Sequence, residues 1–149
     1  MAYIDKAKTV EWTTPQPLFD YLNGRYHFTL DPASTHENAK CEKHYTLADN
    51  GLLLPWGGSV FCNPPYGREL PVWVEKAYME SLDGSLVVML IPARTDTRIW
   101  HDLIFPNATV AFMRGRVHFG QAGPAPFPTA LIRFGGEYEG ITYGDYPRE

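Results

Sequence analysis

The short run Asn63-Pro64-Pro65-Tyr66 combines side-chain and backbone groups that suit chemistry on a flat ring. The asparagine side chain offers an oxygen acceptor, and each proline lacks an N–H, holds φ at about −65° and leaves its carbonyl free to face a ligand. A tyrosine directly after them can stack on a planar ring, and stacking on a nucleic-acid base contributes roughly 1–3 kcal/mol. The four residues therefore predict a rigid, acceptor-rich corner for a heterocycle that carries an NH2 group.

Alkylation of an aromatic amine is the chemistry that this corner favours. Such an amine is a poor nucleophile because its lone pair is delocalised into the ring, and its nitrogen becomes partly positive in the transition state. We expect Asn63 Oδ1 and the Pro64 carbonyl each to accept one N–H, which stabilises the charged nitrogen more than the neutral one. No dedicated general base is required. The alternative is structural, with Asn-Pro starting a turn after a buried strand and Tyr66 capping the core.

The elements that position this corner follow from hydrophobic periodicity and from turn residues. Helices are predicted over residues 15–22, with Thr14 as the N-cap, over 70–82 and over 97–104. Strands are predicted over residues 26–30, 59–62, 85–91, 109–113 and 129–134, and irregular chain over 34–56 and 135–149. Strands that alternate with helices indicate a Rossmann-like α/β sheet, which binds ligands at the carboxyl ends of its strands.

Four strings in this order resemble a known family. They are Glu11-Trp12-Thr13-Thr14-Pro15-Gln16-Pro17-Leu18-Phe19, Leu30-Asp31-Pro32-Ala33-Ser34, Asn63-Pro64-Pro65-Tyr66-Gly67 and Leu90-Ile91-Pro92-Ala93-Arg94-Thr95-Asp96-Thr97. The sequence resembles the amino-methyltransferases that use S-adenosylmethionine, and most closely the phage-type DNA N6-adenine methyltransferase family. The resemblance covers roughly residues 11–134. It implies a compact Rossmann-like methyltransferase fold, and the catalytic residues that it implies are Asn63, Pro64, Pro65 and Tyr66.

The resemblance also implies a set of residues that bind S-adenosylmethionine. They are Trp12, Thr13, Thr14, Pro15, Asp31, Pro32, Ala33, Asp49 and Asn63. Trp12 to Pro15 match the amino-terminal motif that wraps the methionine part of the cofactor, although alone they are typical of a helix cap preceded by a core tryptophan. Asp49 could accept the adenine amine of the cofactor, although Asp-Asn-Gly is also an ordinary turn.

The chain departs from the family's pattern after Asp31, which belongs to the first cofactor motif. Glycines that admit the methionine end of the cofactor usually follow, whereas this chain has Ala33, Ser34 and Thr35. This difference leaves open that Asp31 only caps a turn. Asn63 comes 32 residues after Asp31, whereas two strand-and-helix pairs of average length use at least about 34 residues before any loops. We therefore expect a fold trimmed between the first cofactor motif and the strand before Asn63, with a cofactor pocket that is shallower or completed by a neighbouring chain.

Charge is unevenly distributed along the chain. The net charge of −4 disfavours non-specific binding to nucleic acid by the whole molecule, but residues 86–134 carry five arginines against two aspartates. The arginines expected to grip phosphates beside a target base are Arg94, Arg98, Arg114 and Arg116. Phe119 and Phe127 could pack on that base. The alternative is a set of solvated arginines in ordinary ion pairs and two core aromatic residues.

Length and composition predict one compact domain over residues 1–149, with its core at 11–134 and an acidic tail at 135–149. No signal peptide or membrane span is expected, because the longest uncharged apolar stretch, 86–93, is far shorter than the roughly 20 residues of a span. We expect a cytoplasmic protein of a bacterial host cell, with Cys41 and Cys62 as thiols. His36, Cys41 and His44 invite a zinc hypothesis, but they lack a fourth ligand, and no metal is expected.

The sequence therefore predicts a DNA adenine N6-methyltransferase, from a phage or prophage, that depends on S-adenosylmethionine and acts on an adenine flipped out of the duplex. Two alternatives remain open. The first is a methyltransferase for cytosine N4, an RNA base or a protein glutamine, since the same four-residue motif serves these in related families. The second is an inactive module that keeps the fold and binds DNA or protein. Whether the protein is a monomer or a homodimer is left undetermined.

Overall fold

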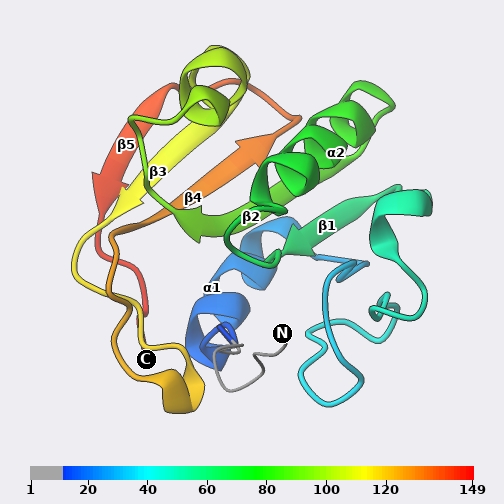
Figure 1. Ribbon diagram of the computed structural model, residues 1–149, viewed down its shortest axis with the longest axis horizontal. Helices are drawn as coiled ribbons and strands as arrows, with labels where there is room; N and C mark the ends of the chain where they lie inside the picture. Colours follow the sequence, from blue (N-terminus) through cyan, green and yellow to red (C-terminus); the bar gives the residue numbers. More distant parts are fainter. Residues whose placement is uncertain (1–11) are drawn as a thin grey trace.

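A computed structural model describes residues 12–149, so the prediction for Glu11 lies outside the described residues. A five-stranded sheet in the order β1-β2-β4-β3-β5 forms the centre of the molecule (Figure 1). The strands are β1 Ser59–Cys62, β2 Leu86–Pro92, β3 Thr109–Met113, β4 Thr129–Phe134 and β5 Ile141–Gly144. The helices are α1 Gln16–Tyr26, α2 Leu70–Leu82 and α3 Phe105–Asn107, with a π-helical turn at Trp100–Ile104 and 3-10 turns at Gly51–Leu53 and Gly120–Ala122.

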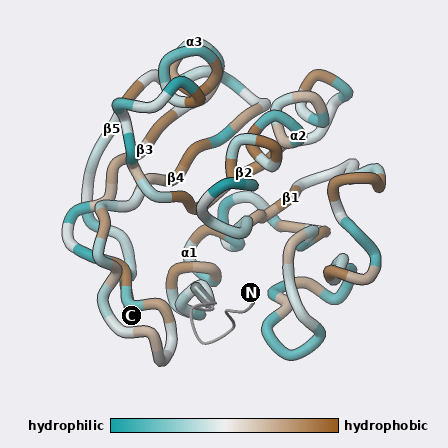
Figure 2. The backbone as a smooth tube through the Cα atoms, in the orientation of Figure 1, coloured by the Kyte–Doolittle hydropathy of each residue, from teal (hydrophilic) through white to brown (hydrophobic). Residues whose placement is uncertain are grey.

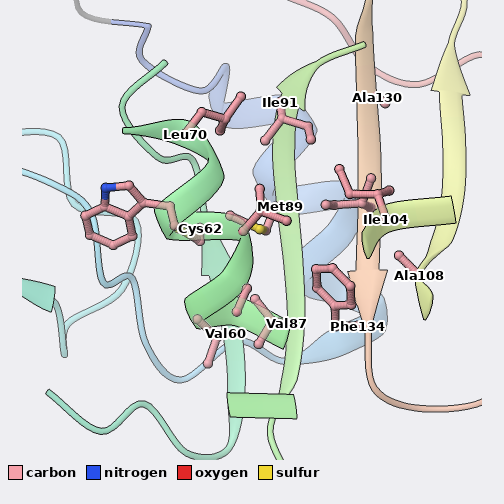
Figure 3. Close-up of a cluster of buried hydrophobic side chains, with 14 of the residues drawn as sticks. Val60, Cys62, Leu70, Val87, Met89, Ile91, Ile104, Ala108, Ala130 and Phe134 are labelled. Carbon is pink, nitrogen blue, oxygen red and sulfur yellow. The ribbon is translucent and has the colours of Figure 1, made fainter. Parts of the chain in front are cut away.

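The two central strands are covered on both faces of the sheet. In β2, side chains alternate between the faces, so Val87, Met89 and Ile91 pack with α2 and the π-helical turn (Figure 3). Val88 and Leu90 pack on the opposite face with apolar side chains of α1. Brown, apolar stretches lie along β3 and β4 in Figure 2. Burial on both faces explains why β2 is a continuous apolar run.

Strand directions follow from the connections. β1 and β2 are parallel and joined by α2, whereas β4 runs antiparallel to both β2 and β3. The first strand ends at Cys62, which pairs with Met89, so Asn63 begins at the carboxyl edge of the parallel pair. The Rossmann-like α/β fold predicted from the sequence is confirmed. Among the described residues, no helix is long and apolar enough to cross a membrane.

The predicted strand over 26–30 is wrong. Helix α1 continues to Tyr26 and ends at His27, whose left-handed backbone (φ 51°) closes the last turn. The chain after it is extended but makes only a single parallel bridge, between Leu30 and Val60. Between Asp31 and β1 the structure contains isolated bridges and one 3-10 turn, which is the trimming that the residue count predicted.

Two further local predictions are wrong. Thr14 does not cap α1, because the N-cap is Pro15 and makes no side-chain hydrogen bond. The tail is not wholly irregular, because β5 pairs in parallel with β3. Arg133 in β4 stabilises the chain that leads into β5: its buried guanidinium donates to the carbonyls of Gly135 at 2.6 Å and Glu137 at 2.9 Å.

Candidate active site

The amide of Asn63 is held by three partners at the carboxyl edge of β1. Its Nδ2 donates to the Trp12 carbonyl oxygen and, at 2.9 Å, to Thr14 Oγ1. The Tyr66 hydroxyl lies 2.7 Å from Asn63 Oδ1 and 2.9 Å from the Leu90 carbonyl oxygen, and its single proton can be donated to either of these two acceptors. An asparagine amide has two N–H donors, and both are used here. Oδ1 keeps one lone pair available for a further donor.

Tyr66 belongs to an aromatic cluster formed with Trp12, Phe119 and Phe127. The Trp12 ring is nearly parallel to that of Tyr66, with centroids 6.2 Å apart and an interplanar angle of 23°. Phe119 and Phe127 meet Tyr66 edge to face at 6.2 and 5.6 Å. Burial raises the pKa of the Tyr66 hydroxyl well above its ordinary value, so the phenol remains a neutral donor at physiological pH.

A cavity of about 490 Å³ opens beside this corner. Ten of the residues predicted to act in catalysis or cofactor binding line it: Trp12, Thr13, Thr14, Asp31, Pro32, Ala33, Asn63, Pro64, Pro65 and Tyr66. The carboxyl edge of the sheet thus brings the amino-terminal motif, the Asp31 segment and the Asn63 corner together. Pro15 is buried at the start of α1 and does not line the cavity.

Asp31 organises the loop that forms one wall of the cavity. Its carboxylate is buried and accepts the backbone N–H of Lys40 at 2.9 Å and that of Ala33 at 3.3 Å. Burial raises the pKa of the Asp31 carboxyl, and the two N–H donors oppose that rise. Both carboxylate oxygens are therefore engaged within the chain itself.

Sequence reasoning assigned no role in the site to several residues of the cavity wall, among them Gly51, Trp73 and Ser34. A Cβ on Gly51 would lie 2.2 Å from the Pro32 carbonyl oxygen, so only glycine lets the 3-10 turn approach the Asp31 segment this closely. Trp73 of α2 and Ser34 each keep one buried polar atom, Nε1 and Oγ, without a hydrogen-bond partner. The signal for Gly51 was present, because a glycine follows Asp49-Asn50, but the residue that it contacts is distant in sequence.

Asp49 lies outside the lining of the cavity. Its exposed carboxylate accepts the backbone N–H of Thr46 at 2.8 Å and the Thr46 hydroxyl at 3.1 Å, and these bonds lower its pKa. The placement matches the ordinary turn that the sequence left open, not a contact with a ligand in the cavity.

The four arginines expected to meet phosphates are all exposed but have different surroundings. The Arg94 guanidinium lies 5.4 Å over the ring of Phe127, at the aromatic cluster. Arg116 donates to the Ala125 carbonyl at 3.2 Å, in the loop that carries Phe119 and Phe127. Arg114 forms an exposed ion pair with Asp145 at 3.6 Å, and Arg98 lies on the helical segment after β2. Arg94 and Arg116 are thus the two associated with the aromatic cluster and its loop.

His36 and His44 hydrogen-bond through their ring nitrogens at 2.8 Å. Across residues 12–149, no group of three or more histidine, cysteine, aspartate or glutamate side chains could hold a metal ion. Burial raises the pKa of the nearby Cys41 thiol to about 11, which disfavours the thiolate that binds metals.

Comparison with known proteins yields a family and several relatives. A family model described as DNA N-6-adenine-methyltransferase (Dam) matches residues 2–128. A DNA N-6-adenine-methyltransferase of Escherichia phage T1 is 39% identical over 89 residues, which cover 58% of this chain and 37% of the phage protein. A putative methyltransferase, YfdM of Escherichia coli strain K12, is 38% identical over 64 residues, or 38% of this chain and 70% of that protein.

Among solved structures, a modification subunit of a putative type I restriction enzyme from Vibrio vulnificus YJ016 superposes with a TM-score of 0.53. The match covers 93% of this chain and 47% of that one, at 13% sequence identity, and shows a shared fold. The chain thus matches well under half of the phage T1 protein's length and about half of the Vibrio subunit's.

Proposed function

The chain belongs to the DNA N-6-adenine-methyltransferase (Dam) family, and on that premise we propose that it methylates the N6 amine of adenine in DNA with S-adenosylmethionine as the methyl donor. The observation that carries this proposal is the Asn63 amide. Its two N–H groups are committed to Trp12 and Thr14, so its oxygen is held toward Tyr66, with one lone pair open to a substrate amine.

The cavity supports S-adenosylmethionine as the cofactor. Its volume of about 490 Å³ falls within the usual range for small-molecule sites, roughly 300–1,000 Å³. Gly51 lies so close to Pro32 that this part of the cavity wall has no room for a side chain at position 51. Ser34 Oγ and Trp73 Nε1, also in residues of the wall, have no hydrogen-bond partner. These residues, with Thr13 and Pro32, would hold the cofactor, whose chemistry is an electrophilic methyl group on a sulfonium centre.

The residues of the corner act on the amine. Asn63 Oδ1 and the Pro64 carbonyl accept its two N–H groups, which favours the positive charge that develops on nitrogen. Preorganised hydrogen-bonding groups that stabilise a developing charge, such as oxyanion-hole donors, contribute about 2.7–4 kcal/mol in other enzymes, or roughly 10²–10³ in rate. The neutral Tyr66 phenol holds Oδ1 from the other side and does not compete as a base.

The adenine must leave the duplex to reach this corner, because its amine is otherwise inside the base stack. Tyr66 and Trp12 line the cavity and supply π-faces for the flipped base, whereas Phe119 and Phe127 are buried in the core behind them. The Trp12 ring is stacked near the Tyr66 ring. Trp12 must therefore shift or share the stack when a base enters. Arg94 and Arg116 would hold the neighbouring phosphates, with Arg98 and Arg114 farther along the strand.

Adenine is favoured over cytosine N4, an RNA base or a protein glutamine, because the family model and the phage T1 relative are both described by N-6-adenine methylation. That description belongs to proteins of which this chain matches only a part, so the activity of this chain requires its own test.

The test is incubation of the purified chain with isotope-labelled S-adenosylmethionine and unmethylated duplex DNA, followed by digestion to nucleosides and mass spectrometry. The expected product is labelled N6-methyldeoxyadenosine. Asn63→Ala should abolish it while the dissociation constant of the cofactor changes by no more than a few fold. Asn107→Ala is the matched control, because Asn107 is an exposed asparagine whose amide donates to the Leu103 carbonyl in the adjoining π-helical turn, away from the cavity lining.

Label on N4 of cytosine would keep the mechanism and replace the substrate. Absence of label from DNA, RNA and protein, together with no cofactor binding by calorimetry, would refute the proposal and leave an inactive module on the same fold.

A further inference from the structure

The orientation of the Asn63 amide depends on a hydroxyl from a distant segment. Asn63 Nδ2 has one backbone partner, the Trp12 carbonyl, and one side-chain partner, Thr14 Oγ1 at 2.9 Å. Thr14 precedes α1 by one residue of chain and is 4% exposed. The hydrogen bond joins this buried threonine, just before α1, to an asparagine just after β1 that is 49 residues away in the chain. It therefore restrains the amide from a segment other than its own.

A flipped amide would be unfavourable in this environment. The flip would place Oδ1 against the Trp12 carbonyl oxygen, which can only accept, and would turn the N–H groups toward the Tyr66 hydroxyl. The Tyr66 hydroxyl has one proton and two acceptors, Asn63 Oδ1 and the Leu90 carbonyl, so it restrains the amide only part of the time. The Trp12 carbonyl therefore sets which way the amide faces, and the Thr14 hydroxyl, by accepting the second N–H, holds the amide plane in place.

We propose that Thr14 is a positioning residue that acts through Asn63: its hydroxyl oxygen accepts Asn63 Nδ2–H and so aims Oδ1 at the substrate amine. This inference rests on the proposed function and deepens it. It also changes the role of Thr14, which the family resemblance places among the cofactor-binding residues. Thr14 does line the cavity, and one lone pair of its hydroxyl oxygen already accepts from Asn63.

The two roles of Thr14 predict different kinetic effects. A positioning residue affects the transition state, in which the amine nitrogen becomes charged, so its loss lowers kcat and leaves cofactor affinity unchanged. A cofactor contact affects the bound ground state, so its loss raises the dissociation constants of S-adenosylmethionine and S-adenosylhomocysteine. Valine replaces the hydroxyl by a methyl of similar size, and serine keeps the hydroxyl without the methyl.

The experiment compares Thr14→Val, Thr14→Ser and a control, Thr142→Val, in an exposed position of β5. For Thr14→Val we expect kcat to fall by roughly three- to tenfold, as for the loss of one hydrogen bond. The dissociation constant of S-adenosylhomocysteine, measured by calorimetry, should stay within about twofold, since the amide does not contact it in this role. Thr14→Ser should recover most of kcat, and Thr142→Val should match wild type.

A second readout does not require activity. The side-chain NH2 of Asn63 gives a pair of proton–nitrogen correlations in NMR, which are assigned by their disappearance in Asn63→Ala. In Thr14→Val one proton of the pair should move upfield and the pair should exchange faster with solvent, whereas Thr14→Ser should restore both.

The outcomes separate this inference from the proposed function. An unchanged Asn63 NH2 pair in Thr14→Val overturns the inference, whatever the enzyme does. A tenfold loss of S-adenosylhomocysteine affinity with unchanged kcat overturns it in favour of a cofactor contact. If the wild-type chain transfers no methyl group, the proposed function fails, and the NMR comparison alone decides whether Thr14 orients the amide.

Discussion

Replacing Tyr66 by phenylalanine removes one oxygen and keeps the ring in the aromatic cluster. The lost hydroxyl donates its one proton to Asn63 Oδ1, at 2.7 Å, or to the Leu90 carbonyl, at 2.9 Å. The pairing of β1 with β2 ends at Met89, so Leu90, the next residue of β2, has no partner in β1. Tyr66→Phe therefore leaves acceptors beside the cavity with fewer donors, while the contacts of the ring with Trp12, Phe119 and Phe127 persist.

The expected loss of stability follows from one hydroxyl and two acceptors. One net hydrogen bond contributes about 0.5–1.5 kcal/mol, and a buried acceptor left unsatisfied costs about 1–3 kcal/mol. Water from the cavity can reach this corner, so we expect a loss of about 1–2 kcal/mol in the free energy of unfolding. At this chain length 1 kcal/mol shifts Tm by roughly 2–4 °C, which gives a fall of roughly 2–8 °C.

The expected effect of Tyr66→Phe on methyl transfer is smaller than that of removing Asn63. The amide keeps its Trp12 and Thr14 partners, so its oxygen stays in place, and we expect kcat to fall less than about tenfold. Urea denaturation measures the stability and single-turnover methylation measures the rate. Tyr143→Phe is the control, because Tyr143 is 82% exposed on β5. Wild-type stability together with a rate loss as large as that of Asn63→Ala would refute the idea that Tyr66 mainly supports Asn63 while Asn63 acts on the amine.

Three other substitutions or conditions test separate parts of the structure. Gly51→Ala should lower the free energy of unfolding by about 1–3 kcal/mol and weaken cofactor binding in calorimetry, because its Cβ would meet the Pro32 carbonyl. The control is Gly24→Ala, which should be neutral or stabilising because nothing lies within 4 Å of its Cβ. Arg133→Met should lower the free energy of unfolding by about 1.5–3 kcal/mol, because it removes the hydrogen bonds to the Gly135 and Glu137 carbonyls. Amide hydrogen exchange should speed up more in β5 than in β2, and equal protection of both strands would contradict this. Burial raises the pKa of the Tyr66 hydroxyl and of the Cys62 thiol. Above about pH 9 the unfolded chain therefore releases protons that the folded chain retains. As a result, the free energy of unfolding should fall with rising pH. Denaturation curves between pH 8 and 11 check this dependence, which should be weaker above about pH 10 in Tyr66→Phe because one such group is gone.

Local signals predicted most of the elements correctly. Strand β1, helix α2 and strands β3 and β4 have the bounds expected from their residues, because an apolar run or a helical stripe followed by turn residues is a short-range pattern. The predicted strand at 26–30 failed because the Asn23 side chain accepts the Phe28 N–H and His27 adopts a left-handed backbone, which extends α1 and then turns the chain. Strand β5 was missed because its pairing depends on β3, whose residues lie 31 positions earlier in the chain than their β5 partners.

By itself, the sequence determined the strand that presents Asn63 and the family resemblance, and it predicted the chemistry of the Asn63 corner, because these depend on residue types in short, ordered runs. Only the tertiary structure decided the hydrogen-bond partners that give those residues their roles. Thr14 bonds to Asn63 and does not cap α1, Gly51 packs on Pro32, and Asp49 bonds to Thr46. The first two pairings join segments far apart in the chain, so they form only when the sheet closes and brings its carboxyl edge together, and no local pattern encodes them.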